Sequence, residues 1–432
     1  MPLQRLLDSI AGFRAGGARV RDWSVYAAET RRLTLGTRDR ETGGPHAPLS
    51  LSKSFGAQFL LVWDDGRVSP GEIDRSEIRS GIDAALARAR LAAYDDPDAA
   101  QVLGPAAVPE VALHDPGAAR IASGEAGPIA ARLARIRDRV AEHGFRTWSG
   151  SMGAAEARAR LVTSAGLDAD VIATSWVWNA TFDGELGDGF RGRAEEPLQE
   201  FDARLWRLAS LVSRLGNPAA RAPSGLRPVI LHPHVVESFV LAILLDNLDG
   251  ASVAHGESHF RPAQFGSTEP ALREDLTLRL DPLEPLRAGS YRFTREGVPA
   301  APCVFVRRGR LLTPVLNLKY ARRLRREPTA VPYEFDTLHL EGPAPLPLPE
   351  ALSEADGGVL VLSVLGVHTQ DATSGDFSLA APQALSIEKA QLGGRVRPTL
   401  SGNLFDSLRS DAMRLVRFEG FTTPGLLFEC RL

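Results

Sequence analysis

The segment from Gly366 to Leu404 begins directly after GGVLVLSVL, a run with the composition of a buried strand. Gly366 and Gly375 stand where a chain leaving a strand has to turn, and glycine tolerates the backbone conformations that such turns need. The segment therefore predicts loops at the rim of a sheet, a common place for functional groups. Its polar side chains form one cluster: His368, Thr369, Ser374 and Asp376.

At 432 residues the chain exceeds one ordinary core, so two domains are expected. The formal net charge is −3, and the densest basic run, ARRLRR at Ala321–Arg326, is short. This charge pattern gives no support to a nucleic-acid-binding function.

Only two cysteines are present, Cys303 and Cys430, which argues against a disulfide framework and fits a reducing compartment. The N-terminal residues are amphipathic and lack the apolar core of a signal peptide. No apolar stretch reaches the roughly 18 residues of a membrane span. We therefore expect a cytoplasmic protein without membrane association.

Residues 1–216 are predicted to form a mixed α/β domain. Helices are expected at 3–13, 76–94 (capped by Ser76), 129–143 (ended by Gly144) and 198–215, and strands at 22–37, 56–63 and in a meander over 146–183. Residues 217–225, NPAARAPSG, have the composition of a linker. Residues 226–432 are predicted to be β-rich, with a strand at 227–231 and a helix from Pro233 to Leu248. The expected fold class is α+β with two domains.

The rim segment also carries a resemblance. Its pattern G-x-H-T-x-x-x-x-S-G-D-F-S, followed by S-G-N-L, is similar to the C-terminal signature of the TldD/PmbA family, described as modulators of DNA gyrase and as a two-subunit zinc peptidase. A second segment resembles the family at Glu296, Gly297, Val298, Pro299, Gly309, Leu311, Tyr320, Ala321 and Arg322, but Ala330 stands where the family usually has glycine. The resemblance implies a β-rich C-terminal domain of the TldD/PmbA type.

The zinc-binding residues of that family are missing here. TldD-type subunits carry H-E-x-x-x-H, a spacing that lets two histidines face one zinc while the glutamate acts as a base. The corresponding window, Leu241–Asp246, reads LAILLD, and Asp246 is its one ligand type. The family's C-G-K segment is also absent, and Cys430 does not match it.

The resemblance therefore implies a PmbA (TldE)-type subunit: no cofactor or catalytic residue of its own, zinc in a TldD-like partner of a heterodimer, and unfolded peptides as substrate. Candidate residues for a substrate groove are His368, Thr369, Ser374, Asp376, Phe377 and Asn403.

Two alternatives remain open. His255, Glu257 and His259 would point to one face of a strand and could hold a metal, which would suit a homodimeric metal-dependent peptidase acting alone. The other alternative is a non-enzymatic adaptor protein.

Two further clusters favour structural roles. His232 is expected to cap the helix that follows it, with Glu237 near the positive end of the helix dipole, although His234 and Glu237 could share a face. His368, Asp376 and Ser374 or Ser378 have the composition of a catalytic triad but lack the nucleophile-elbow motif.

Overall fold

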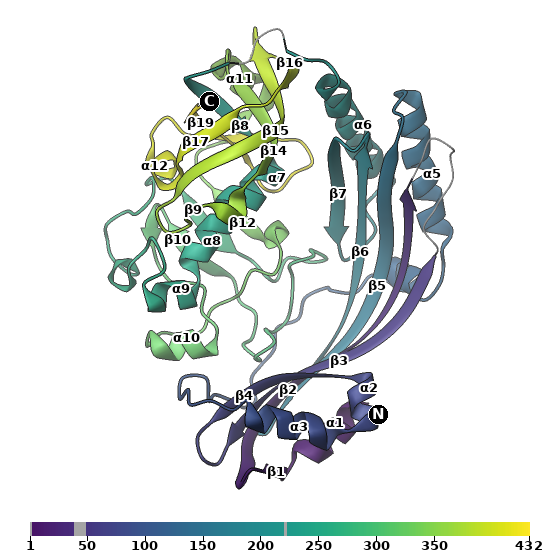
Figure 1. The fold of residues 1–432 in the computed structure, drawn as a ribbon, viewed down its shortest axis with the longest axis vertical. Helices are drawn as coiled ribbons and strands as arrows, with labels where there is room; N and C mark the ends of the chain where they lie inside the picture. The colour runs from purple at the N-terminus through teal and green to yellow at the C-terminus, as the bar shows by residue number, and fades with distance from the viewer. Residues whose placement is uncertain (1, 39–48, 220–222) are drawn as a thin grey trace.

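The structure is a computed structural model that describes residues 2–38, 49–219 and 223–432. Both halves of the chain combine helices and sheets, so the predicted α+β class is confirmed (Figure 1). The predicted linker, 217–225, falls partly on 220–222, outside the described residues. The domain boundary placed there stays a prediction.

One long, curved antiparallel sheet dominates the N-terminal half. Its strands run in the order β4-β3-β2-β5-β6-β7, with β1 paired to β2. The strands are β1 (Arg14–Ala15), β2 (Ala18–Arg38), β3 (Ser50–Trp63), β4 (Val68–Asp74), β5 (Trp148–Thr163), β6 (Asp168–Phe182) and β7 (Leu186–Gly192). The helices are α1 (Pro2–Ile10), α2 (Arg75–Ser80), α3 (Ile82–Leu91), α4 (Pro116–Ala122), α5 (Gly127–Glu142) and α6 (Leu198–Leu215).

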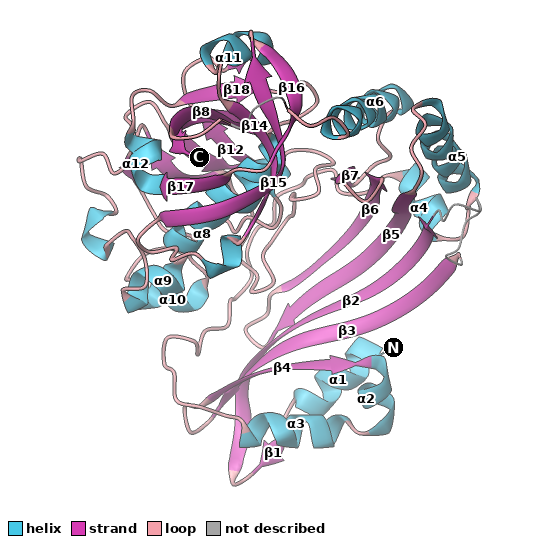
Figure 2. Cartoon of the chain, turned by 45° about the horizontal axis from the view of Figure 1, so that its top comes forward, coloured by secondary structure: helices cyan, strands magenta, loops and turns pink. Residues whose placement is uncertain are grey.

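All six of these helices cover the same face of the sheet. Val25 and Phe59 pack under α1–α3, and Trp178, buried like Leu33, packs under α4–α6. Residues of opposite parity point the other way, because side chains alternate along a strand. Tyr26 accordingly contacts a small cluster with Phe293 of the C-terminal half. Figure 2 shows the C-terminal half on this second, concave side of the sheet.

One expected helix is wrong in detail. The segment predicted as a single helix over 76–94 is two helices, α2 and α3, separated by Gly81. Asp74, not Ser76, is the N-cap, because its carboxylate accepts the backbone N–H groups of Ser76 and Glu77 at 2.8 and 2.9 Å. Glu77 bonds back to the N–H of Asp74, completing a capping box.

The C-terminal half contains two sheets. One has the order β11-β10-β9-β12, and the other β13-β18-β19-β17-β15-β14-β8, with β16 paired to β15. The strands are β8 (Leu226–Leu231), β9 (Thr277–Leu280), β10 (Cys303–Arg307), β11 (Arg310–Leu311), β12 (Leu338–Glu341), β13 (Leu346–Pro347), β14 (Val359–Leu365), β15 (Asp376–Glu388), β16 (Gln391–Val396), β17 (Thr399–Asn403), β18 (Arg414–Arg417) and β19 (Gly425–Arg431).

Short helices connect these strands. They are α7 (Pro233–Val235), the π-helical turn η1 (Val236–Leu241), α8 (Ala242–Leu248), α9 (Gly250–His255), α10 (Leu318–Arg323), α11 (Leu348–Glu354) and α12 (Leu404–Arg409), with 3₁₀ turns η2 (Pro262–Gln264), η3 (Phe335–Thr337) and η4 (Val367–Thr369). The first three segments together form the helix predicted over Pro233–Leu248. No helix of the described residues is both long and apolar enough to cross a membrane.

The larger C-terminal sheet is buried on both faces. Val229 and Leu231 of β8 point into the main core, and Ile230 between them points into a second core beneath α6 and α11. Strands buried on both sides read as continuous apolar runs. This explains why GGVLVLSVL, which contains β14, lacks polar alternation.

Substitution of Gly358 tests how closely the backbones of β14 and β8 pack at their junction. A Cβ atom at this position would lie 2.0 Å from the Pro228 carbonyl oxygen. We expect Gly358→Ala to destabilise the protein by about 1–3 kcal/mol, because backbone rather than a flexible side chain would have to move. The midpoint of thermal unfolding measures this. Gly127→Ala is the matched control, since nothing lies within 4 Å of the added atom; an equal loss in both variants would contradict the interpretation.

Candidate functional site

The first part of the rim segment, residues 366–375, forms a compact loop between β14 and β15. Gln370 holds it closed, because its side-chain amide donates to the Gly366 carbonyl at 2.7 Å and accepts the Ser378 N–H at 2.8 Å. Thr369 also donates to the Gly366 carbonyl, at 2.9 Å. Ser374 lies inside the same turn and accepts the Asp376 N–H at 3.2 Å. The loop is therefore ordered by its own side chains.

Asn403 ties this loop to the helix that follows β17. Its amide nitrogen donates to the Ser374 carbonyl at 2.9 Å and to the Asp376 carboxylate at 2.8 Å. Its amide oxygen accepts the Asp406 N–H at 3.1 Å and so caps α12. Asn403 therefore positions the loop.

Two of the predicted groove residues, Phe377 and His368, differ in their exposure to solvent. Phe377 is 4% exposed and packs edge-on against Phe239, with ring centroids 5.1 Å apart, so it belongs to the core and its assignment to a groove is wrong. Alternation along β15 explains this, because Asp376 and Ser378 on either side are exposed. His368 is exposed on η4. Within the described residues, no hydrogen bond joins its ring to Ser378 or Asp376, so no triad forms.

The window corresponding to the family's zinc ligands lies beside this loop. Asn247, next to Asp246 on α8, donates to the Ala372 carbonyl of the loop at 2.8 Å. Leu241 is fully buried in the main core. Partial burial and the nearby Asp249 carboxylate raise the pKa of Asp246. A single carboxylate beside a buried leucine does not fit zinc, which takes at least three protein ligands.

The proposed triplet His255–Glu257–His259 does not form the expected strand. His255 ends α9, and Gly256 follows in the left-handed conformation. Asp249, which caps α9, and Gly256 are the sequence signals that predict this helix.

The side chains of the triplet diverge. Arg323 donates to His255 Nε2 at 3.2 Å, whereas Arg409 donates to His259 Nε2 at 2.9 Å. The ring of His259 stacks on Phe405 at 3.7 Å, and Glu257 is exposed. In the part of the chain that the structure describes, no group of three His, Cys, Asp or Glu residues could hold a metal ion.

The most concentrated set of buried charges lies at the start of the α7–α8 helix. His232 caps this helix as expected, accepting the His234 N–H at 3.4 Å. The ring of His234 lies between two carboxylates, with Nε2 2.9 Å from Asp188 on β7 and Nδ1 3.7 Å from Glu237. Sequence reasoning missed Asp188, which stands 46 residues earlier and has no local motif.

Arg204 of α6 extends this cluster. Its guanidinium lies 3.7 Å from Asp188 and 3.1 Å from Glu196, which also accepts the indole N–H of Trp178 at 2.8 Å. Burial raises the pKa of Glu196. The carboxylates of Glu196 and Asp188 alternate with the cations Arg204 and His234, and these four groups form one network between the halves of the chain.

The two neighbouring histidines have opposite pKa shifts. Burial, followed by repulsion from His234, lowers the pKa of His232 to about 3. Burial also opposes the charge on His234, but its bonds to Asp188 and Glu237 outweigh that effect and raise its pKa to about 9. At neutral pH, His234 is therefore the charged member of the pair.

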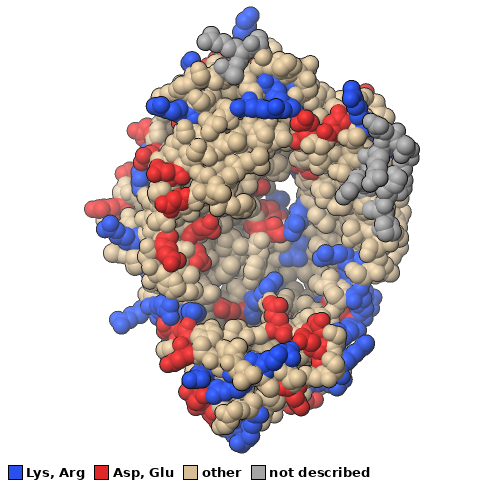
Figure 3. All heavy atoms as spheres, viewed as in Figure 1, with Lys and Arg blue, Asp and Glu red and all other residues tan. Residues whose placement is uncertain are grey.

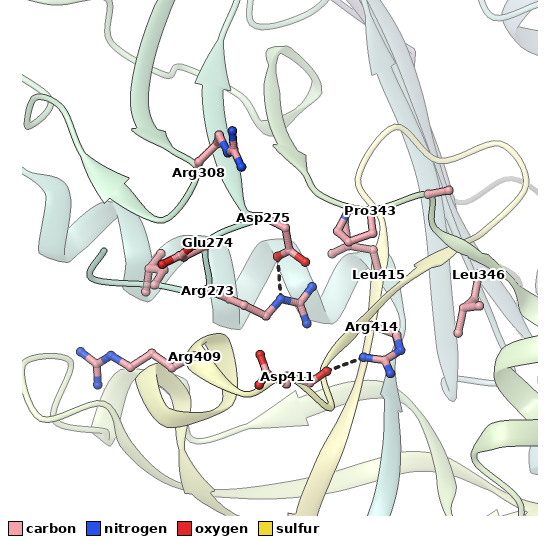
Figure 4. Close-up of a pocket in the computed structure, with 12 residues that line it drawn as sticks. Arg273, Glu274, Asp275, Arg308, Pro343, Leu346, Arg409, Asp411, Arg414 and Leu415 are labelled. Carbon is pink, nitrogen blue, oxygen red and sulfur yellow. Dashed lines mark hydrogen bonds and ion pairs between the residues drawn. The ribbon is translucent and has the colours of Figure 1, made fainter. Parts of the chain in front are cut away.

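The structure contains two cavities of substantial size, of which one borders these groups. One, of about 900 Å³, lies between α6 and the C-terminal half and includes Asp188, His232 and His234 in its wall. The other, of about 780 Å³, lies near the start of β9 and the end of α12 (Figure 4). In the second cavity Arg273 is paired with Asp275 at 2.6 Å and Arg414 bonds the Asp411 carbonyl at 2.5 Å.

Asn403→Ala tests the positioning role of that residue. Loss of the cap and of two loop hydrogen bonds is expected to cost about 1–2 kcal/mol. Hydrogen–deuterium exchange should also rise across residues 366–378. His368→Ala, which removes an exposed ring from the same loop, should change neither quantity. Equal exchange in the wild type and Asn403→Ala would contradict this role.

The pKa of His234 predicts a pH-dependent stability. Because its folded pKa of about 9 exceeds the ordinary value of 6.5, its contribution is complete below pH 6.5 and is lost as the pH rises through 9. As the pH rises from 6.5 to 9, the thermal midpoint of the wild type should therefore decrease, and that of His234→Gln should decrease less. Since 38% of the side chain is exposed, solvent screens the pair and the effect will be modest. Parallel pH curves for the two proteins would contradict this prediction.

Comparison with known proteins adds independent information. Residues 224–430 match the family described as the PmbA/TldA metallopeptidase C-terminal domain. A comparison with curated proteins finds no significant match. The fold resembles TldE from Thermococcus kodakarensis, with a TM-score of 0.78, 17% identity, and coverage of 100% of this chain and 99% of that one.

Two proposed modulators of DNA gyrase have the same fold. The protein from Bacteroides thetaiotaomicron has a TM-score of 0.74 at 18% identity, covering 100% of this chain and 96% of its own. The protein from Thermotoga maritima has a TM-score of 0.74 at 18% identity, covering 100% and 99%. Residues 224–430 therefore form a C-terminal domain of the PmbA/TldA metallopeptidase family, and the fold of the whole chain resembles that of TldE.

Proposed function

We propose that this chain is the metal-free subunit of a two-subunit zinc peptidase of the TldD–TldE type, which degrades or processes unfolded peptides. The observation that carries the proposal is the composition of the ligand window. Leu241 is buried in the core, Ala242 follows, and Asp246 is the one residue of the window able to bind a metal. Zinc and the catalytic base would then belong to a TldD-like partner.

The shape of the chain suits a role in enclosing a substrate. Figure 3 shows a hollow between the C-terminal half and the upper part of the curved sheet. The sheet face opposite Trp178 carries small and polar side chains such as Ser151 and Asn179, whose side chains are hydrogen-bonded at 2.8 Å. A hollow bounded by a polar sheet face could accept an extended polypeptide, whereas a folded domain would be too large.

The alternative of a peptidase acting alone receives less support. It would need the ligands His255, Glu257 and His259, and the structure separates their side chains. No specific observation favours an adaptor function. A metal-free subunit accounts for both the family match and the unsuitable ligand window.

Co-expression with an H-E-x-x-x-H subunit from the same genome tests the proposal. In zinc-supplemented medium, the chain alone is expected to be inactive on an unfolded peptide and free of stoichiometric metal by native mass spectrometry. Together, the two proteins should co-elute and cleave the peptide, with zinc in the partner.

Variants of this chain distinguish a metal-free subunit from a peptidase that acts alone. In the co-purified complex, His255→Ala and His259→Ala should leave peptidase activity unchanged. One metal per chain in the isolated protein, lost in either variant, would overturn the proposal and favour a peptidase that acts alone.

A further inference from the structure

The cavity of about 900 Å³ beside α6 has the size of a small-molecule site. One face of α6 forms its wall, because Trp206, Ser210 and Arg214 recur at helical spacing, as do Arg207 and Leu211. The opposite wall comes from the C-terminal half, where α11, β14 and the loop between β18 and β19 contribute. Figure 1 shows α6 at the top of the molecule, next to β16.

Most of this lining is apolar. Leu211, Leu348, Leu362, Leu392 and Phe418 surround the interior. Trp206 is 56% exposed although it borders the cavity, so a large aromatic surface is free for contact. Burial of an apolar ligand body against these side chains would be favourable.

Arg207 supplies an uncommitted cation in this apolar setting. Its Nε atom is buried and has no hydrogen-bond partner among the described residues. Its Nη2 atom lies against Gly420, where a Cβ atom would approach it to 2.6 Å, so the absence of a side chain at 420 makes room for the guanidinium. Burial, and then repulsion from Arg204, lower the pKa of Arg207, while attraction to Asp188, Glu419 and Glu196 acts in the opposite direction.

The other charged side chains near the cavity are either bonded within the protein or exposed to solvent. Asp188 is already bound to His234 and to the Gly189 N–H at 2.7 Å. Arg214 donates to the Leu392 carbonyl at 2.7 Å, and exposed Arg417 adds positive charge at the edge. Glu419 is exposed and forms no ion pair with Arg207 in the described part of the chain. Besides Arg207, the lining therefore offers an anionic group the cations Arg214, Arg417 and His234, against the two carboxylates Asp188 and Glu419.

We propose that this cavity binds a carboxylate with an apolar body, the carboxylate on Arg207 and the apolar part against Trp206, Leu211 and Leu362. Free medium-chain carboxylates and the apolar C-terminal end of a peptide share this chemistry. The site is separate from the ligand window, because Leu241–Asp246 lies about 10–18 Å along the helix from His234 at a rise of about 1.5 Å per residue. All of its lining residues belong to this chain.

Titration calorimetry of the full chain tests the proposal, with decanoate below its micellar concentration as the probe. Decanoate should bind saturably at one site. Decanol, which lacks the charge, should bind with an affinity at least about tenfold lower. N-acetyl-trileucine is compared as the free acid and as the C-terminal amide. Tighter binding of the free-acid peptide than of decanoate would identify a peptide end as the source, and the reverse order a free carboxylate.

Variants assign the contacts. Arg207→Gln should weaken binding of the acid probes about tenfold with little change in the thermal midpoint, because Arg207 forms no direct ion pair with a described residue and its Nε has no hydrogen-bond partner there. Trp206→Ala should also weaken binding and, being exposed, should fold normally. Arg137→Gln on α5 makes the same charge change at an exposed position away from the cavity and should bind as the wild type does. No saturable binding of either acid, equal binding of decanol, or wild-type binding by Arg207→Gln would overturn the proposal.

Discussion

One buried carboxylate links the two halves of this chain. Asp188 at the end of the curved sheet lies between two cations. One is His234, in the first turn of the α7–α8 helix, and the other is Arg204 of α6. A buried charge is costly unless it is paired, and removing one partner leaves the other uncompensated. The network therefore favours one docking geometry, although buried ion pairs contribute little net stability.

Apolar clusters join the halves at α6 and around Phe293, and several further contacts between the halves are polar. Near the base of the sheet, Lys319 pairs with Asp96 at 2.8 Å and Arg323 with Asp98 at 3.0 Å. Arg193 at the end of the sheet donates to the Ser290 carbonyl at 2.5 Å. Because these contacts require directed partners, they specify orientation more narrowly than an apolar interface of the same size would. The concave face of the sheet is left open between them.

The same helix that receives His234 also carries the altered ligand window. Leu241 makes that part of the helix core, while the loop beside it keeps its shape through Gln370 and Asn403. An ordered loop beside an apolar window suits the proposed role of a subunit that leaves the metal chemistry to its partner.

The sequence alone predicted the α+β class, most of the longer helices and the resemblance to the TldD/PmbA family, because periodicity, caps and motifs are local properties. It predicted α6 and the Pro233–Leu248 helix, and its capping signals at Asp249 and Gly256 already opposed a strand at His255–His259. Only the tertiary structure showed that Phe377 is core and that Asp188 meets His234. These depend on which face of a strand is covered and on which distant segments pack together, and residue spacing along the chain specifies neither.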